Sequence, residues 1–189
     1  MHTNQSGRLI GAIFGLVFVL ANAGALPTAA AIPLRVLAII VFLRLFTAMR
    51  RDGAAADRAA TDGTGTDGAT GATFGRGYRL VVGAEVLVGL GGLFVLARVL
   101  HVPQAAIGWI ALVVGFHFFG LAVVWRMPSV HVLAAGLTAC GAAGLAMVRA
   151  DAPHAAVAAV AGIVPGVLLL SAVGWTVWAS KRAVAAGRP

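Results

Sequence analysis

The sequence predicts an all-α fold: a polytopic transmembrane bundle of six helices, with the N-terminus and the C-terminus in the cytoplasm. Three observations predict it. Six long apolar runs fill most of the 189 residues, and 60% of the chain is apolar. Only 11% of the residues are charged, against roughly 25% in a soluble domain. Arginine and lysine gather at one set of run ends, as they do on the cytoplasmic side of membrane proteins.

Each run is long enough to cross a bilayer as a helix, which needs about 20 mostly apolar residues. Barrel strands would alternate over about ten residues, and these runs do not. Proline and short polar links separate most successive runs, so these neighbours should pack antiparallel. We expect a single transmembrane domain over residues 1–189, with helices at about residues 9–26, 28–46, 80–100, 105–125, 130–148 and 155–179.

The segment of residues 47–78 differs from the runs, because glycine, alanine, threonine and aspartate dominate it. It has too little apolar content to fold alone, so we expect a flexible cytoplasmic loop. With the N-terminus inside, eleven arginines and lysines lie on the inner side, and only Arg98 and Arg149 on the outer side. Abundant Ala, Gly and Arg indicate a bacterial protein of the cytoplasmic (plasma) membrane.

The net charge of +8 comes without a nucleic-acid-binding motif, so no nucleic acid is expected as a partner. The lipid bilayer is the expected partner. Small-xxx-small faces, such as Gly7, Gly11 and Gly15, would serve contacts within the chain, a homo-oligomer or a membrane partner subunit. Cys140 is the single cysteine, and the histidines lack a pair at one depth for haem. We therefore expect no cofactor and no metal.

The first run leaves two interpretations open. Its Ala21-Asn22-Ala23 pattern behind an apolar stretch resembles a signal-peptide cleavage site, in which case residues 1–23 would be removed. The apolar stretch continues through the pattern, and a single arginine precedes it. We expect a retained helix.

Two polar residues of neighbouring runs lie at similar predicted depth. Glu85 lies about 8 Å into the third helix from the cytoplasmic side, and His117 about 12 Å into the fourth. Such a pair could share a proton, act as acid and base, or join two helices by a hydrogen bond. Arg44, near the inner end of the second helix, is an alternative partner for Glu85.

Arg35 lies toward the outer side of the second helix, shortly after Pro33. Asn22 of the first helix is at comparable depth. The two could bind an anionic headgroup or substrate from the outer leaflet, or Arg35 could extend outward to phospholipid. In the sixth helix, Pro165 should kink the chain near mid-membrane, because proline removes a helical hydrogen bond.

The stretch Gly115-Phe116-His117-Phe118-Phe119-Gly120-Leu121-Ala122, followed by an arginine and a proline, resembles a box in small multi-pass membrane proteins of bacteria without established function. The resemblance covers mainly the fourth to sixth helices. It implies a helical bundle, brings no activity, and raises interest in His117.

Three functions remain open. The first is a non-enzymatic protein, a small transporter-like or accessory membrane subunit with Glu85 and His117 as its polar centre. The second is a membrane-embedded enzyme for a lipid or isoprenoid substrate. The third is a structural partner protein. Nucleotide-binding, serine-hydrolase and zinc-protease signatures are absent from the sequence, which favours the first over an enzyme.

Overall fold

The computed structural model of the protein describes residues 5–62, 76–125 and 128–186, and within them every regular element is a helix. The elements are α1 (Gln5–Asn22), η1 (Ala23–Ala25), α2 (Thr28–Asp62), α3 (Arg76–Phe94), η2 (Val95–Val99), η3 (Pro103–Ala105), α4 (Ala106–Trp125), α5 (Pro128–Arg149), α6 (His154–Ala158), η4 (Ala159–Ile163) and α7 (Val164–Ala185). Because α6, η4 and α7 follow one another without a break, the described residues form six helical rods. The predicted all-helical class is confirmed.

The predicted loop of residues 47–78 is wrong at both of its ends. Helix α2 does not end at Phe46 but continues to Asp62, and α3 already begins at Arg76. The extension is rich in alanine, which has the highest helix propensity. It is also held by packing, since Met49 is only 3% exposed and lies against α1 and α7. Residues 63–75 lie outside the described residues.

Five helices are long and apolar enough to cross a membrane: Gly7–Ala25, Thr28–Ala54, Pro103–Val123, Pro128–Arg149 and His154–Ala183. The described side chains of the remaining rod give a shorter apolar stretch, Val86–Val99. That α3 crosses a membrane therefore stays a prediction, as does the side on which the termini lie.

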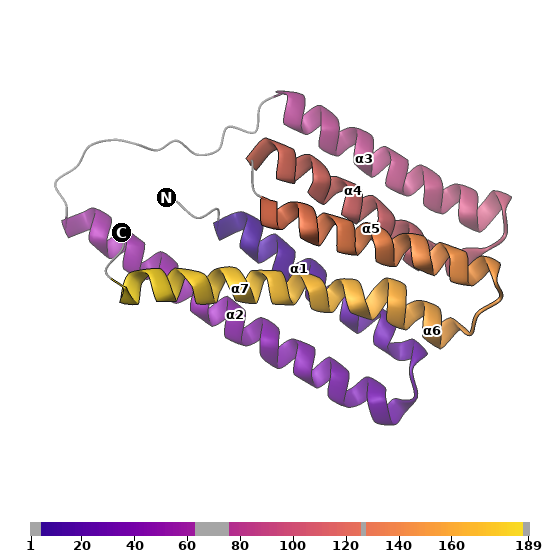
Figure 1. The fold of residues 1–189 in the computed structure, drawn as a ribbon, viewed down its shortest axis with the longest axis horizontal. Helices are drawn as coiled ribbons and strands as arrows, with labels where there is room; N and C mark the ends of the chain where they lie inside the picture. The colour runs from indigo at the N-terminus through magenta and orange to yellow at the C-terminus, as the bar shows by residue number, and fades with distance from the viewer. Residues whose placement is uncertain (1–4, 63–75, 126–127, 187–189) are drawn as a thin grey trace.

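The rods lie side by side, with α2 and α3 at opposite edges of the bundle (Figure 1). Helices α1 and α7 pack together and carry α2, whereas α4 and α5 pack together and carry α3. The short links at residues 23–27, 100–105 and 150–153 lie at one end of the bundle, which we call the hairpin end. The opposite end, where α1 begins and α7 ends, is the terminal end.

Two apolar clusters hold the rods together. The central cluster takes one buried residue from each of α1, α4, α5 and α7: Phe18, Ala111, Leu137 and Leu169. The second joins α1, α2 and α7 through Ala12, Met49, Leu170, Val173 and Val177. Because α1 and α7 each contribute to both clusters, these two helices join the two halves of the bundle.

Small residues bring the backbones of these rods close together. A Cβ built at Gly15 in α1 would lie 2.9 Å from the carbonyl oxygen of Gly166 in α7. One built at Gly108 in α4 would lie 3.0 Å from the carbonyl oxygen of Gly141 in α5. In an apolar solvent, such close contact supplies the van der Waals attraction between helices. The predicted small-residue faces thus serve contacts within this chain.

Pro165 lies immediately after an irregular turn in the last rod. Its side chain is fully buried, and the π-helical turn η4 ends two residues before it. Proline lacks an N–H, so the helical hydrogen bond to the carbonyl of Ala161 is missing. A π-helical turn thus lies just before Pro165, and the kink expected at this proline stays a prediction.

Candidate functional site: a groove between α1 and α4

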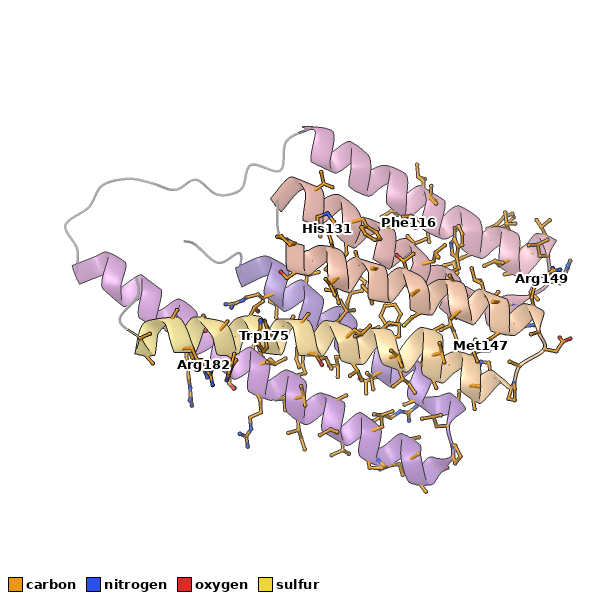
Figure 2. The ribbon with its side chains drawn as sticks, viewed as in Figure 1. Phe116, His131, Met147, Arg149, Trp175 and Arg182 are labelled. Carbon is orange, nitrogen blue, oxygen red and sulfur yellow. The ribbon has the colours of Figure 1, made fainter. Side chains whose placement is uncertain are left out.

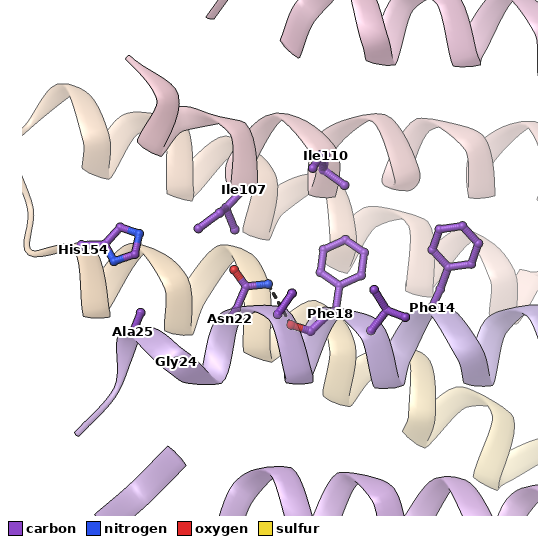
Figure 3. A pocket seen from close by; sticks show the side chains of 10 residues that line it. Phe14, Phe18, Asn22, Gly24, Ala25, Ile107, Ile110 and His154 are labelled. Atoms are coloured by element: carbon purple, nitrogen blue, oxygen red, sulfur yellow. Dashed lines mark hydrogen bonds between the residues drawn. The ribbon is translucent and has the colours of Figure 1, made fainter. Parts of the chain in front are cut away.

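A groove of about 570 Å³ lies between α1 and α4 and extends to the hairpin end (Figure 3). Its walls are apolar. Phe14 and Phe18 face it from α1, while Ile107 and Ile110 face it from α4 (Figure 3). Val17, Ala21, Asn22, Gly24, Ala25 and His154 complete the lining. The volume lies within the range of about 300–1,000 Å³ that is typical of ligand pockets.

Asn22 is the buried polar residue of this groove. Its Nδ2 donates to the carbonyl oxygen of Phe18 at 2.8 Å, one turn back along α1 (Figure 3). The side chain packs directly on Gly162, where any Cβ would overlap the amide group. Gly162 belongs to η4, so the π-helical turn and the missing side chain together make room for Asn22. An amide in this position is paired through its donor and keeps a carbonyl oxygen as acceptor.

Arg35 approaches the same end of the groove from α2. Its side chain is half-buried, and a Cβ built at Gly24 would lie 3.0 Å from its Nη2. The Nε is enclosed and has no hydrogen-bond partner. Gly24 also lines the groove, so the guanidinium lies next to one of the lining residues. The structure therefore brings Asn22 and Arg35 to the same end of the bundle.

His154 borders the groove at the hairpin end, where α6 begins (Figure 3). It follows Pro153 and is exposed. Its place in the lining of a groove was not predicted from the sequence. One signal could have indicated it: His154 follows the link after α5, which lies at the same end of the bundle as the predicted position of Arg35.

Helices α3 and α4 are joined by an indole. Trp109 Nε1 donates to the carbonyl oxygen of Gly89 at 3.1 Å, and the ring occupies the space beside Gly92, where any Cβ would overlap it. Gly89 also faces Val113. Residue 89 is thus level with about residue 111. This contact fixes the register between the two antiparallel helices.

The register bears on the predicted Glu85 and His117 pair. Trp109, Val113 and His117 are spaced by four residues, so they share the face of α4 that meets α3. One turn from Gly89, the backbone position of residue 85 comes level with Gly115, close to His117. His117 is half-buried, and its ring meets that of Phe118 edge-on at 6.1 Å. The side chain of Glu85 lies outside the described residues.

Arg44 lies on α2 and is exposed. Its carbonyl oxygen accepts a hydrogen bond from Thr47 Oγ1 at 3.0 Å. Because α2 and α3 are at opposite edges of the bundle (Figure 1), the arrangement does not favour the alternative pair of Arg44 with Glu85. Similar predicted depth alone therefore does not bring the two residues together.

A polar cluster at the terminal end was missed by sequence reasoning. Arg8 of α1 donates from Nε to Thr176 Oγ1 at 3.0 Å and from Nη2 to the carbonyl oxygen of Thr176 in α7. Asp52 of α2 interacts electrostatically with Arg8, and its Oδ2 is buried without a hydrogen-bond partner. The sequence analysis had placed residue 52 in a loop. The sequence offered one signal for this contact. Arg8 precedes the first apolar run and Thr176 lies near the end of the last one, so both were expected on the same side of the membrane.

Aromatic and basic side chains cover the surface at the same end. The rings of Trp175 and Trp178 lie 4.8 Å apart, and the Arg182 guanidinium lies 3.7 Å above the Trp178 ring. All three residues are exposed. Figure 2 labels Trp175 and Arg182 on α7. Such pairs are typical of the level where a membrane protein meets lipid headgroups.

No protein family, no curated protein and no solved structure matches this chain. The resemblance carried by the box around His117 therefore stays a prediction. Among the described side chains, no three His, Cys, Asp or Glu residues come together as they would in a metal site. The groove and the polar residues beside it are the basis on which a function can be assigned.

Proposed function

We propose that this chain is a multi-pass protein of the bacterial cytoplasmic membrane, an accessory subunit that holds the apolar part of a lipid-like amphiphile without changing it chemically. The groove between α1 and α4 supports this proposal. Its lining extends from Phe14 to Ala25, roughly 16 Å along α1. An apolar wall of this length suits a hydrocarbon chain, and the polar groups at the hairpin end suit its head.

The lining argues for binding over catalysis. Acid–base chemistry on a lipid would need a carboxylate or a similar group beside the bound molecule. Of the residues that the structure describes around the groove, only His154 is titratable, and it lies at the rim. No described residue of α3 contributes to the lining, so the groove does not extend to the helix that carries Glu85.

The core argues against a transport path between Glu85 and Arg35. Arg35 lies on α2 at one edge of the bundle, and α3 forms the other edge (Figure 1). A path between them would have to pass the buried cluster that contains Phe18 and Leu137. Within the described residues this region is apolar. We therefore favour the accessory subunit over the transporter.

Glu85 and His117 remain a proposed polar centre of this subunit. The shared face and level of their positions support a contact that holds α3 against α4. Buried polar groups join membrane helices in this way, contributing about 0.6–2 kcal/mol.

Photocrosslinking tests the proposal. A phospholipid that carries a photoreactive group at the end of one acyl chain should label peptides of α1 and α4 in the purified protein. Ile110→Trp fills the groove and should reduce this labelling to background. Ile39→Trp is the matched control, because Ile39 is as exposed as Ile110 (41% and 39%) but lies on α2, outside the groove.

Labelling that is spread evenly over all helices, or that both tryptophan variants leave unchanged, would contradict a binding groove. The lipid recovered from the protein should be chemically unchanged by mass spectrometry. Conversion of that lipid to a new product would favour the enzyme alternative.

A further inference from the structure

Arg35 is a cation for which the described residues supply no anion. No hydrogen bond or ion pair joins its guanidinium to any of them, and its Nε is enclosed by protein although the side chain as a whole is half-buried. A charge taken out of water without a partner is costly, so a partner from outside the described residues is expected. The Arg35 side chain extends from α2 toward η1, where it lies against Gly24.

The guanidinium lies next to the hairpin end of the groove. Arg35 does not itself line the groove, but a Cβ built at the lining residue Gly24 would be 3.0 Å from its Nη2. The hairpin end of the groove also carries the amide of Asn22 and the imidazole of His154 (Figure 3). Polar groups are thus gathered at this end, whereas Phe14, Val17 and Ile110 line the rest.

The depth also fits a headgroup. Arg35 lies about two turns, or roughly 10 Å, from the first residue of α2. The polar layers of a bilayer are several ångströms thick on each side of a hydrocarbon core of about 30 Å. A long arginine side chain at this depth is within reach of the phosphate level.

We propose that the groove takes an anionic, phosphate-bearing lipid and that Arg35 binds its phosphate. This inference rests on the proposed function and names the class of its ligand. Guanidinium and phosphate form paired, charge-assisted hydrogen bonds, which would give the terminal nitrogens of Arg35 an anionic partner. The acyl chain then lies along the apolar wall of α1 and α4.

Native mass spectrometry with three lipids of identical acyl chains tests this inference. They are phosphatidic acid, phosphatidylcholine and diacylglycerol, which differ in headgroup charge and in the presence of phosphate. Wild-type protein should bind phosphatidic acid about tenfold more tightly than diacylglycerol, as expected for a charged hydrogen bond. Arg35→Gln should remove this preference and leave the binding of diacylglycerol unchanged.

Arg98→Gln is the matched control, because Arg98 is also a basic residue near the hairpin end but is exposed. It should keep the preference of the wild-type protein. Glycerol 3-phosphate, which has the phosphate without the chain, should not displace phosphatidic acid. Displacement at equal concentration would mean that the site binds free phosphate compounds, and would overturn the assignment to a lipid.

Equal binding of the three lipids by wild-type protein would overturn the inference, and so would an Arg35→Gln variant that keeps the preference. In either case, loss of all lipid binding in Ile110→Trp would still support the groove itself. If Arg35→Gln does not fold by circular dichroism and gel filtration, the three-lipid comparison on wild-type protein and on Arg35→Lys decides. Arg35→Lys keeps the charge but loses the paired geometry, so it should retain only part of the preference.

Discussion

Polar side chains inside this bundle mostly find their partners in the backbone. Asn22 donates to the carbonyl oxygen of Phe18, Trp109 to that of Gly89, and Arg8 to that of Thr176. Backbone carbonyls are available wherever a glycine lets a side chain approach, and an unpaired donor in an apolar medium is costly. At the residue scale, glycines make room for two of these three side chains, Gly162 for Asn22 and Gly92 for Trp109.

The contact between Asn22 and Gly162 gives a prediction at this scale. Gly162→Ala should lower the free energy of unfolding by roughly 1–3 kcal/mol, because its Cβ would overlap the Asn22 amide. Asn22→Ala should remove much of this penalty when the two changes are combined. A double-mutant cycle, with unfolding by denaturing detergent as the measurement, isolates the coupling.

Gly120→Ala is the control for this cycle. Gly120 lies on α4 with nothing within 4 Å of a Cβ, so alanine should be neutral or slightly stabilising through its helix propensity. Additive effects of Gly162→Ala and Asn22→Ala would show that the two residues are not in contact.

Among the elements, α3 is the most weakly held of the six rods in the described residues. Within the described residues, α4 is the helix against which α3 packs extensively. Most of the described side chains of α3 are exposed, and Leu87 is 72% exposed. The Trp109 indole against Gly89 and Gly92 is its clearest specific contact. An element with few packing contacts opens at lower free energy than the rest of the fold.

This attachment gives a prediction at the element scale. Gly92→Val should displace the indole and release α3, whereas Gly91→Val should not, because Gly91 faces open space. Both variants place the same residue in the same turn of the helix, so differences in propensity cancel. Hydrogen exchange in α3, measured by mass spectrometry in nanodiscs, should increase in Gly92→Val only. Equal exchange in the two variants would mean that Trp109 does not hold α3.

The error in α2 belongs to this scale as well. Residues 47–62 resemble a linker in composition, but their alanines and arginines also favour a helix. What decides between the two is Met49, which packs into a cluster formed by α1 and α7. A helix that extends beyond its apolar run can be recognised only when the residues of other helices that pack against the extension are known.

The whole molecule has different chemistry at its two ends. Exposed cations of the terminal end include Arg50, Arg51, Lys181 and Arg182, and the exposed charges near the hairpin end include Arg98, Arg149 and Asp151. Basic residues near helix ends favour the cytoplasmic side. The predicted orientation, with the terminal end in the cytoplasm, follows from this asymmetry.

Cysteine labelling in intact cells tests the orientation. Cys140→Ser provides a background without cysteine, since the chain has a single one. Into it, Asp151→Cys and Lys181→Cys each place an exposed thiol at one end of the bundle. A membrane-impermeant maleimide should label Asp151→Cys in intact cells and Lys181→Cys only after permeabilisation. The reverse pattern would invert the molecule, and labelling of both in intact cells would contradict insertion in a membrane.

Composition and run length were enough to predict three features of this protein: an apolar outer surface, an all-helical class and the approximate position of most helices. The reason is that hydrocarbon imposes one local rule: backbone groups must be paired within the segment, so a long apolar run becomes a helix whatever its neighbours are. That Asn22 and Arg35 lie toward the same end of the bundle followed from their positions along their helices.

The lateral arrangement was decided by tertiary structure alone. That α7 packs against both α1 and α5, that α2 and α3 form opposite edges, and that Arg8 meets Thr176 are consequences of which helix faces are complementary. Between membrane helices this choice depends on close van der Waals fit at small residues such as Gly15 and Gly166, and many glycines in the sequence could have provided it. The groove arises from that fit, where α1 and α4 diverge around the side chains that line it.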